Sequence, residues 1–114
     1  METKSLFLRV NAIRPIGQSR FLDLLADTVR QLSVRFPPAL LSDGQDPTIP
    51  DSLDQTLPVH DRYFGAIVLG VLSNDSGSTS ERTAFLNEAD CAYRSLWREA
   101  AAHRQIGVAE GGLQ

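Results

Sequence analysis

The sequence predicts an all-α protein, a small bundle of three to four helices with a long Pro-rich crossover loop and a flexible C-terminal tail. Apolar residues recur at spacings of three and four along most of the chain, which is the repeat of an amphipathic helix. Five of the six prolines fall within residues 37–58, where no regular helix can continue. A chain of 114 residues has room for one domain. We therefore expect a single helical domain over residues 1–104 and a tail over residues 105–114, which contains three glycines.

The first predicted helix spans residues 4–13 and ends before Pro15 and Gly17. Leu6, Val10 and Ile13 have helical spacing, although the segment is short and also suits a strand. The prediction favours the helix.

The second predicted helix, residues 19–36, has the clearest pattern in the chain. Ser19 is a candidate cap for its first turn. Its apolar face is formed by residues three and four apart: Phe21, Leu22, Leu25, Val29, Leu32 and Phe36. Pro37 and Pro38 end it.

The segment between the helices, residues 39–57, combines turn-forming residues with four aspartates. It also retains aliphatic residues that solvated linkers tend to lack: Leu40, Leu41, Ile49, Leu53 and Leu57. A loop this long in a small domain is either functional or without fixed structure. Two interpretations stay open, an irregular crossover held to the core by these aliphatics, and a protruding loop or short hairpin that a partner orders.

A third helix is predicted to begin at Pro58 and to form the centre of the bundle. It is apolar over more than half its circumference, through Phe64, Ile67, Val68, Val71 and Leu72. Gly65 and Gly70 lower its helix propensity but permit close packing with a neighbouring helix.

The last helix is predicted to follow a turn at residues 73–78 and to end near Arg104. Ser78 and Glu81 have the spacing of a capping box. We expect its core face to be formed by Phe85 or Leu86, Ala89, Tyr93, Leu96, Trp97 and Ala100. Cys91, the only cysteine, lies in this helix and is expected to be a buried thiol.

Composition excludes several classes of function. The net charge of −3 and the absence of a basic stripe argue against a DNA-binding protein. One cysteine allows no intrachain disulfide, and the longest apolar run, residues 66–72, is too short to span a bilayer. No secretion signal is evident, so we expect an aqueous, reducing compartment and no membrane partner.

No catalytic or metal-binding constellation is visible, so we expect no enzyme, no catalytic residue, no metal site and no cofactor. His60 and His103 are the only histidines and lie in different elements. His60 and Asp61 are adjacent on a predicted helix, where neighbouring side chains diverge, which favours a role in capping and at the surface.

Four stretches occur in an order that is informative. They are SRFLDLLAD with RQL and RFP in residues 19–37, QTLP at 55–58, DRYFGAIV at 61–68, and NDS at 74–76 before a helix with Ala89, Tyr93 and Ala100. From residue 19 to about residue 102 this order resembles the head-to-tail adaptor proteins of tailed bacteriophages, also called connector or neck proteins.

The resemblance implies a structural virion protein at the head–tail junction, present in the host cytoplasm during assembly. Such adaptors form a ring, typically of twelve copies, between the portal protein and the stopper or tail, and DNA passes through its channel as non-specific cargo. In that setting the crossover would contact a neighbouring subunit, the stopper or the channel, through Leu40, Leu41, Ile49 and Leu53. The tail would order on the portal through Ile106, Val108 and Leu113.

Two other functions are compatible with the sequence. A small acidic phage-encoded inhibitor or immunity protein would bind a basic surface of a host protein. An acidic transcriptional regulator would use residues 19–35 as a recognition helix and would bind DNA in a salt-dependent manner.

Overall fold

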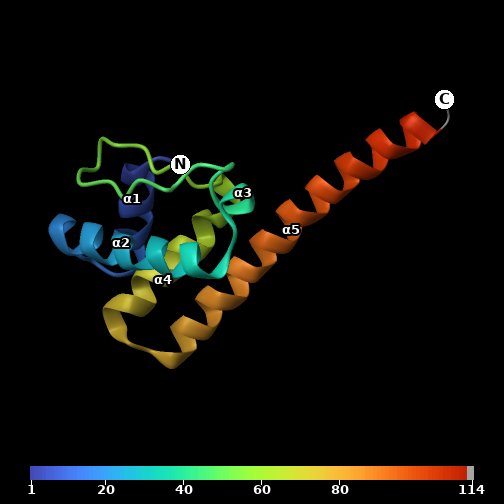
Figure 1. Ribbon diagram of the computed structural model, residues 1–114. Helices are drawn as coiled ribbons and strands as arrows, with labels where there is room; N and C mark the ends of the chain where they lie inside the picture. The colour runs from blue at the N-terminus through green and yellow to red at the C-terminus, as the bar shows by residue number, and fades with distance from the viewer. Residues whose placement is uncertain (113–114) are drawn as a thin grey trace.

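A computed structural model describes the backbone of residues 1–112 and the side chains of residues 1–102. The described chain is helical and contains no strand, which confirms the all-α prediction (Figure 1). Its elements in order are α1 (Thr3–Ile13), α2 (Gln18–Arg35), α3 (Pro38–Leu41), the 3₁₀ helix η1 (Asp61–Tyr63), α4 (Phe64–Ser76) and α5 (Thr79–Gly112).

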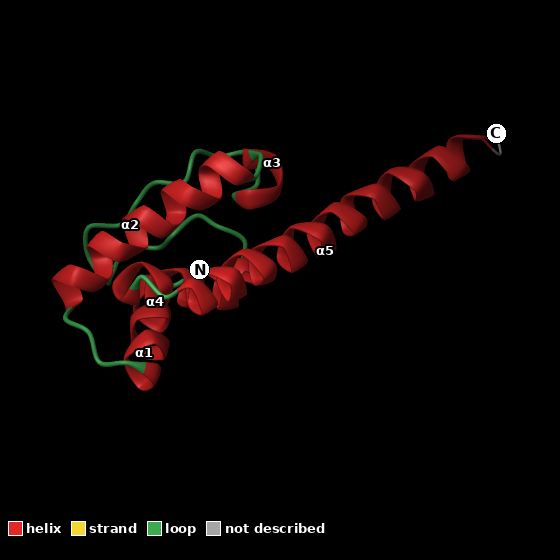
Figure 2. Ribbon diagram, turned by 90° about the horizontal axis from the view of Figure 1, so that it is seen from below, coloured by secondary structure: helices red, strands yellow, loops and turns green. Residues whose placement is uncertain are grey.

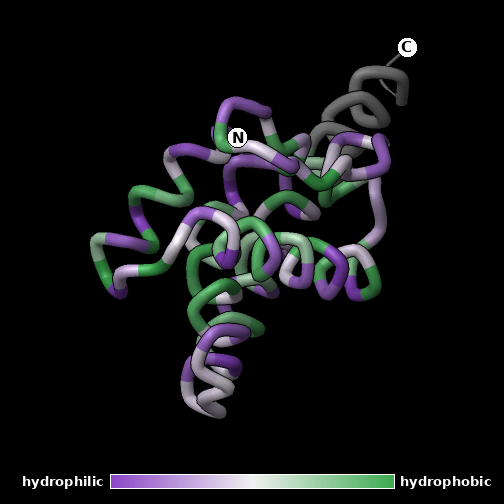
Figure 3. The backbone as a smooth tube through the Cα atoms, turned by 90° about the vertical axis from the view of Figure 1, so that its left-hand side faces the viewer, coloured by the Kyte–Doolittle hydropathy of each residue, from purple (hydrophilic) through white to green (hydrophobic). Residues whose placement is uncertain are grey.

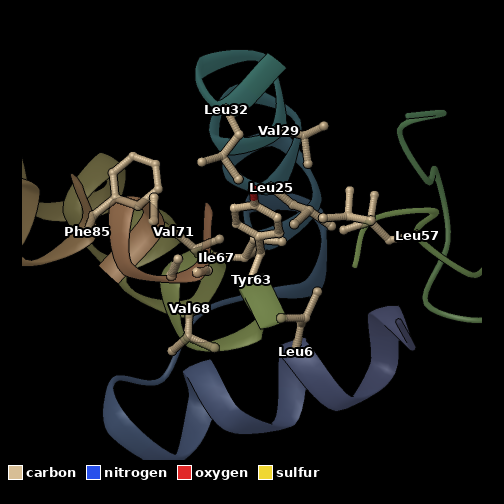
Figure 4. Packing of buried hydrophobic residues seen from close by; sticks show 14 of the residues in the cluster. Leu6, Leu25, Val29, Leu32, Leu57, Tyr63, Ile67, Val68, Val71 and Phe85 are labelled. Carbon is tan, nitrogen blue, oxygen red and sulfur yellow. The ribbon is translucent and has the colours of Figure 1, made fainter. Parts of the chain in front are cut away.

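Helix α4 lies at the centre of the bundle, as its apolar composition predicts. Helices α1, α2 and α5 all pack against it. Hydrophobic stretches of the chain meet at the middle of the bundle (Figure 3), and Figure 4 shows their side chains packed together there. Phe21 and Leu25 of α2 and Ile67 of α4 are completely buried in this core. The α2 face is therefore the predicted one, but Ser19 lies inside the first turn and Gly17 occupies the N-cap without a side-chain hydrogen bond.

Gly70 is the point of closest approach between the helices. A Cβ atom on Gly70 would lie 2.5 Å from Cγ2 of Thr28 in α2 and 2.9 Å from Cε1 of Phe85 in α5. The predicted role of glycine in close packing is thus confirmed at Gly70. It is wrong for Gly65, around which a Cβ atom would meet nothing within 4 Å.

Both ends of α4 differ from the prediction. Pro58 lies outside the helix, because the chain remains extended through His60 and makes the 3₁₀ turn η1 before α4 begins at Phe64. At the other end α4 continues through the predicted turn to Ser76. Gly77, with φ of +69°, ends it in the left-handed conformation that glycine adopts without strain. The Glu81 amide then donates to Oγ of Ser78 at 3.4 Å, which is one half of the predicted capping box. The other half is absent, because the Ser78 amide donates to Oγ of Ser76 at 3.0 Å and the Glu81 carboxylate accepts from Arg14.

The crossover between α3 and η1 is held to the rest of the chain, which supports the first of the two interpretations. Leu57 and Val59 near its end are buried in the core, as is Leu41 at the end of α3. The chain start pairs with the end of the crossover, since the Met1 amino group donates to the Leu57 carbonyl at 2.7 Å and the Leu57 amide donates to the Met1 carbonyl at 2.9 Å. The crossover runs from α3, beside α5, back over α1 (Figure 1).

Helix α5 is much longer than the bundle it packs on. Leu96 is its last core residue, and the helix then leaves the bundle (Figures 1 and 2). The radius of gyration is therefore 16.0 Å, against about 13 Å for a compact chain of this length. The predicted end near Arg104 is wrong, because the helix continues to Gly112, within the segment predicted as a flexible tail. Three glycines in residues 105–112 lower the helix propensity, but no proline interrupts this stretch.

Arg14 joins the ends of three helices. Its guanidinium donates to the Leu72 carbonyl at 3.2 Å, to Asp75 at 3.5 Å and to Glu81 at 2.6 Å. Arg20 donates to the same Asp75 carboxylate at 2.8 Å. The hydrogen bond from Arg20, with a further contribution from Arg14, lowers the pKa of Asp75 against the opposing effect of partial burial.

We expect Asp75→Asn to lower the melting temperature at pH 7. The folded pKa of Asp75 lies below that of the unfolded chain, so its contribution to stability is complete above about pH 4 and is lost as the pH falls through the folded value. The difference between variant and wild type should therefore shrink between pH 5 and pH 2, as measured by circular dichroism melts. Asp23→Asn, at an exposed position with no ion pair to a described side chain, is the control. A difference that stays constant down to pH 2 contradicts this account.

Candidate functional site

The side chains expected to carry no chemistry are the metal-ligating types and the His60–Asp61 pair. Within residues 1–102 no three histidine, cysteine or acidic side chains are grouped as metal ligands would be. His60 precedes η1 without capping it by a side-chain hydrogen bond, and Asp61 is 90% exposed and 3.7 Å from the Met1 amino group. This pair therefore lies at the surface, as expected, but not in the expected capping role.

The most distinctive surface feature lies on α5 where the helix leaves the bundle. Trp97 is 55% exposed, although the helical pattern predicts it in the core. It lines a groove of about 420 Å³ between α3 and α5. The groove is formed by small and apolar residues: Pro37, Ala39, Leu40, Tyr93, Trp97, Ala100 and Ala101. We call it the Trp97 groove. A large aromatic side chain exposed in an apolar hollow is typical of protein–protein contact sites.

Tyr93 forms the inner wall of the Trp97 groove and is held from behind. Its ring stacks on Phe36 at a centroid distance of 4.9 Å and an interplanar angle of 22°. Arg35, next to Phe36, makes a two-pronged contact with the Asp90 carboxylate at 3.0 and 3.2 Å. These contacts tie the end of α2 to α5, so the inner wall is fixed before any partner binds.

Arginines border the Trp97 groove on its outer side. Arg94 and Arg98 line a second hollow of about 280 Å³ together with Tyr93 and Trp97. Both arginines are exposed and make no ion pair with any side chain of residues 1–102. Arg62 of η1 contacts Ser95 and Glu99, the residues that directly follow Arg94 and Arg98. The groove thus combines apolar walls with unneutralised positive charge, which suits a segment that carries both aliphatic and acidic residues.

The residues predicted to contact partners are in different situations. Leu40 lines the Trp97 groove, whereas Leu41 is 1% exposed and cannot contact a partner in this fold. Ile49 and Leu53 are half-buried against the core. For the predicted tail contacts, the side chains of Ile106 and Val108 lie outside the described part of the chain, as does Leu113 entirely.

The spacing of apolar residues does not show where a helix extends beyond the helices that pack against it. For this reason the sequence did not predict the Trp97 groove. Tyr93 and Trp97 follow Ala89 at four-residue intervals and share its face, but the bundle ends between them. The expectation of a buried thiol at Cys91 is wrong. Cys91 is exposed because it points away from the helix face that carries the buried Ala89 and Ala92. Arg94 and Arg98 beside Trp97 were the one available signal of an exposed site.

Comparison with protein families, with curated proteins and with solved structures found no match to this chain. Among the described helices, none is both long enough and apolar enough to cross a membrane.

Proposed function

We propose that this protein is a head-to-tail adaptor that forms a ring between a phage portal and the stopper or tail. The observation that carries the proposal is helix α5, which packs on the bundle up to Leu96 and then continues away from it with Trp97 exposed at the point of departure. A helical segment without neighbours is only marginally stable in water. Such a segment gains its packing from another molecule, as the resemblance to adaptors implies.

The charge of the chain is compatible with a ring that surrounds DNA. The net charge is −3, and the aspartates of the crossover are all exposed. A surface of this kind repels the phosphate backbone, so DNA would pass without being held. The proposed partners are further copies of the chain, the portal and the stopper or tail protein. The protein would act through protein–protein contacts, without a catalysed reaction or a cofactor.

The test is assembly on the portal protein encoded in the same genome. The full chain is mixed with purified portal, and the complexes are examined by native mass spectrometry and electron microscopy. We expect a monomer or weak oligomer in isolation and a closed ring on the portal. Deletion of residues 106–114 should weaken docking at least about tenfold, because it shortens the segment that lacks neighbours in the bundle.

Other outcomes contradict the proposal in distinguishable ways. A tight complex of fixed stoichiometry with one host protein, together with no portal binding, indicates the inhibitor. DNA binding that weakens steeply with salt indicates the regulator. A genome without portal, capsid and tail genes beside this one also rules out the adaptor.

A further inference from the structure

The charges of this chain are unevenly distributed. Between Arg35 and Arg62 there is no lysine or arginine, and the segment carries five of the fourteen acidic residues. The remainder of the chain holds nine acidic against eleven basic residues. Residues 36–61 are therefore acidic, whereas the rest of the chain is slightly basic. Opposite charges on these two parts can attract each other between two copies of the chain.

The acidic charges of the crossover are available for binding. Four aspartates, Asp43, Asp46, Asp51 and Asp54, are exposed. None of them forms an ion pair with a described side chain. Ile49 and Leu53 lie among them and are half-buried, so each also presents apolar surface to solvent. Residues 43–54, which we call the acidic segment, thus carry the two kinds of group that the Trp97 groove suits.

The acidic segment is already shaped before a partner arrives. The Asp51 amide donates to the side-chain carbonyl of Gln55 at 2.9 Å, and Thr3 donates its hydroxyl to the Gln55 carbonyl at 2.6 Å. The segment is therefore fastened to the start of α1. A preformed segment loses little conformational entropy on binding.

We propose that the Trp97 groove of one copy binds the acidic segment of a second copy of this chain. Arg94 and Arg98 would face aspartates of the neighbour, and Trp97 would cover its aliphatic residues. The inference specifies the contact between copies in the ring and rests on the proposed function to that extent.

The placement of the two surfaces favours a ring. The acidic segment reaches over α1 (Figure 1), whereas the Trp97 groove lies between α3 and α5. Each copy can thus use its groove and its acidic segment at the same time. A contact between two different surfaces is heterologous, and repetition of such a contact produces rings or open filaments.

The test is a charge exchange in the full chain. Arg94→Glu with Arg98→Glu makes the groove acidic, and Asp46→Lys with Asp51→Lys makes the segment basic. Sedimentation equilibrium up to about 1 mM, a range that detects weak contacts, measures self-association at low salt. Each double variant alone should associate at least about tenfold more weakly than wild type. An equal mixture should recover to within about threefold, because every groove then meets a segment of opposite charge.

Matched controls carry the same net charge at other exposed positions, which form no ion pair with a side chain of residues 1–102. Arg9→Glu with Arg82→Glu matches the first variant, and Asp23→Lys with Glu88→Lys matches the second. Both controls should self-associate as wild type does. Circular dichroism melts verify that all variants fold. Trp97→Ala should also weaken association about tenfold, since exposed tryptophans in apolar hollows dominate contact energies.

The inference and the proposed function can fail separately. Wild type that remains monomeric at about 1 mM, double variants that associate as wild type does, or a mixture that does not recover, each overturns the inference. Loss of portal binding in Trp97→Ala with unchanged self-association assigns the groove to the portal and also overturns it. Charge-dependent self-association without any portal binding supports the inference and contradicts the adaptor function.

Discussion

Replacing Gly70 by alanine is expected to destabilise the protein by about 1–3 kcal/mol, although alanine is the better helix former. The new methyl group would lie 2.5 Å from Cγ2 of Thr28 and 2.9 Å from the Phe85 ring. Neither neighbour can move freely. The Thr28 hydroxyl donates to the Leu24 carbonyl at 2.8 Å and accepts a hydrogen bond from Asn74 at 3.0 Å, and Phe85 is 1% exposed. Relief of the overlap therefore requires α2 or α5 to move away from α4.

The control for this prediction is Gly65→Ala in the same helix. A Cβ atom at Gly65 meets nothing within 4 Å, so the substitution should leave stability unchanged or raise it by up to about 1 kcal/mol. Urea unfolding followed by circular dichroism measures both variants. The double variant Gly70→Ala with Thr28→Ser should recover part of the loss, because serine lacks the methyl group nearest to the new Cβ. Equal effects at Gly65 and Gly70 would contradict the close approach of the helices.

The sequence predicts α2, α4 and α5 because each has a strong local signal, whereas α1 has a weaker one and the short helix α3 is not predicted within the crossover. The spacing of apolar residues in α2 requires one buried face, and the face observed is the predicted one. The apolar residues of α4 extend round most of the helix, which places it at the centre of the bundle. Helix ends are less determined. Pro58 is suited to the first turn of a helix. Its neighbours Leu57 and Val59 are both buried in the core, however, and the chain stays extended there until His60. The start of α4 is thus set by tertiary contacts that no local pattern contains.

Partners in space are also invisible to a local pattern. Asp90, Arg94 and Arg98 have the order that predicts ion pairs along one helix, yet Asp90 binds Arg35 from α2. This leaves Arg94 free at the edge of the Trp97 groove. The candidate site was therefore unpredictable as a site. Each residue of the Trp97 groove has an ordinary place in a helical repeat. The groove forms because α5 continues beyond the ends of α2 and α3, which leaves Trp97 without a neighbouring helix to cover it.

The second large effect is expected at Tyr63, a completely buried side chain at the end of η1. Its ring lies among core residues of α1, α2 and α4 (Figure 4). Its hydroxyl donates to the Leu40 carbonyl at 3.1 Å. Tyr63→Ala should lower the free energy of unfolding by about 3–5 kcal/mol, because it leaves a cavity and an unpaired carbonyl. Tyr63→Phe keeps the ring and should cost only about 0.5–1.5 kcal/mol for the lost hydrogen bond.

The same residue makes stability depend on alkaline pH. Burial, with a smaller effect of the nearby Tyr93, raises the pKa of Tyr63 from 10.0 to about 12. Between these values the unfolded chain releases the phenol proton while the folded chain retains it, so stability is complete below pH 10 and falls as the pH rises towards 12. The loss should reach about 2 kcal/mol in wild type at pH 11.5. Tyr63→Phe lacks the phenol and should not show it, so the stability difference between the two proteins should change with pH by that amount. Urea unfolding at pH 8, 10 and 11.5 measures it, and parallel curves for the two proteins would show that Tyr63 ionises as it does in the unfolded chain.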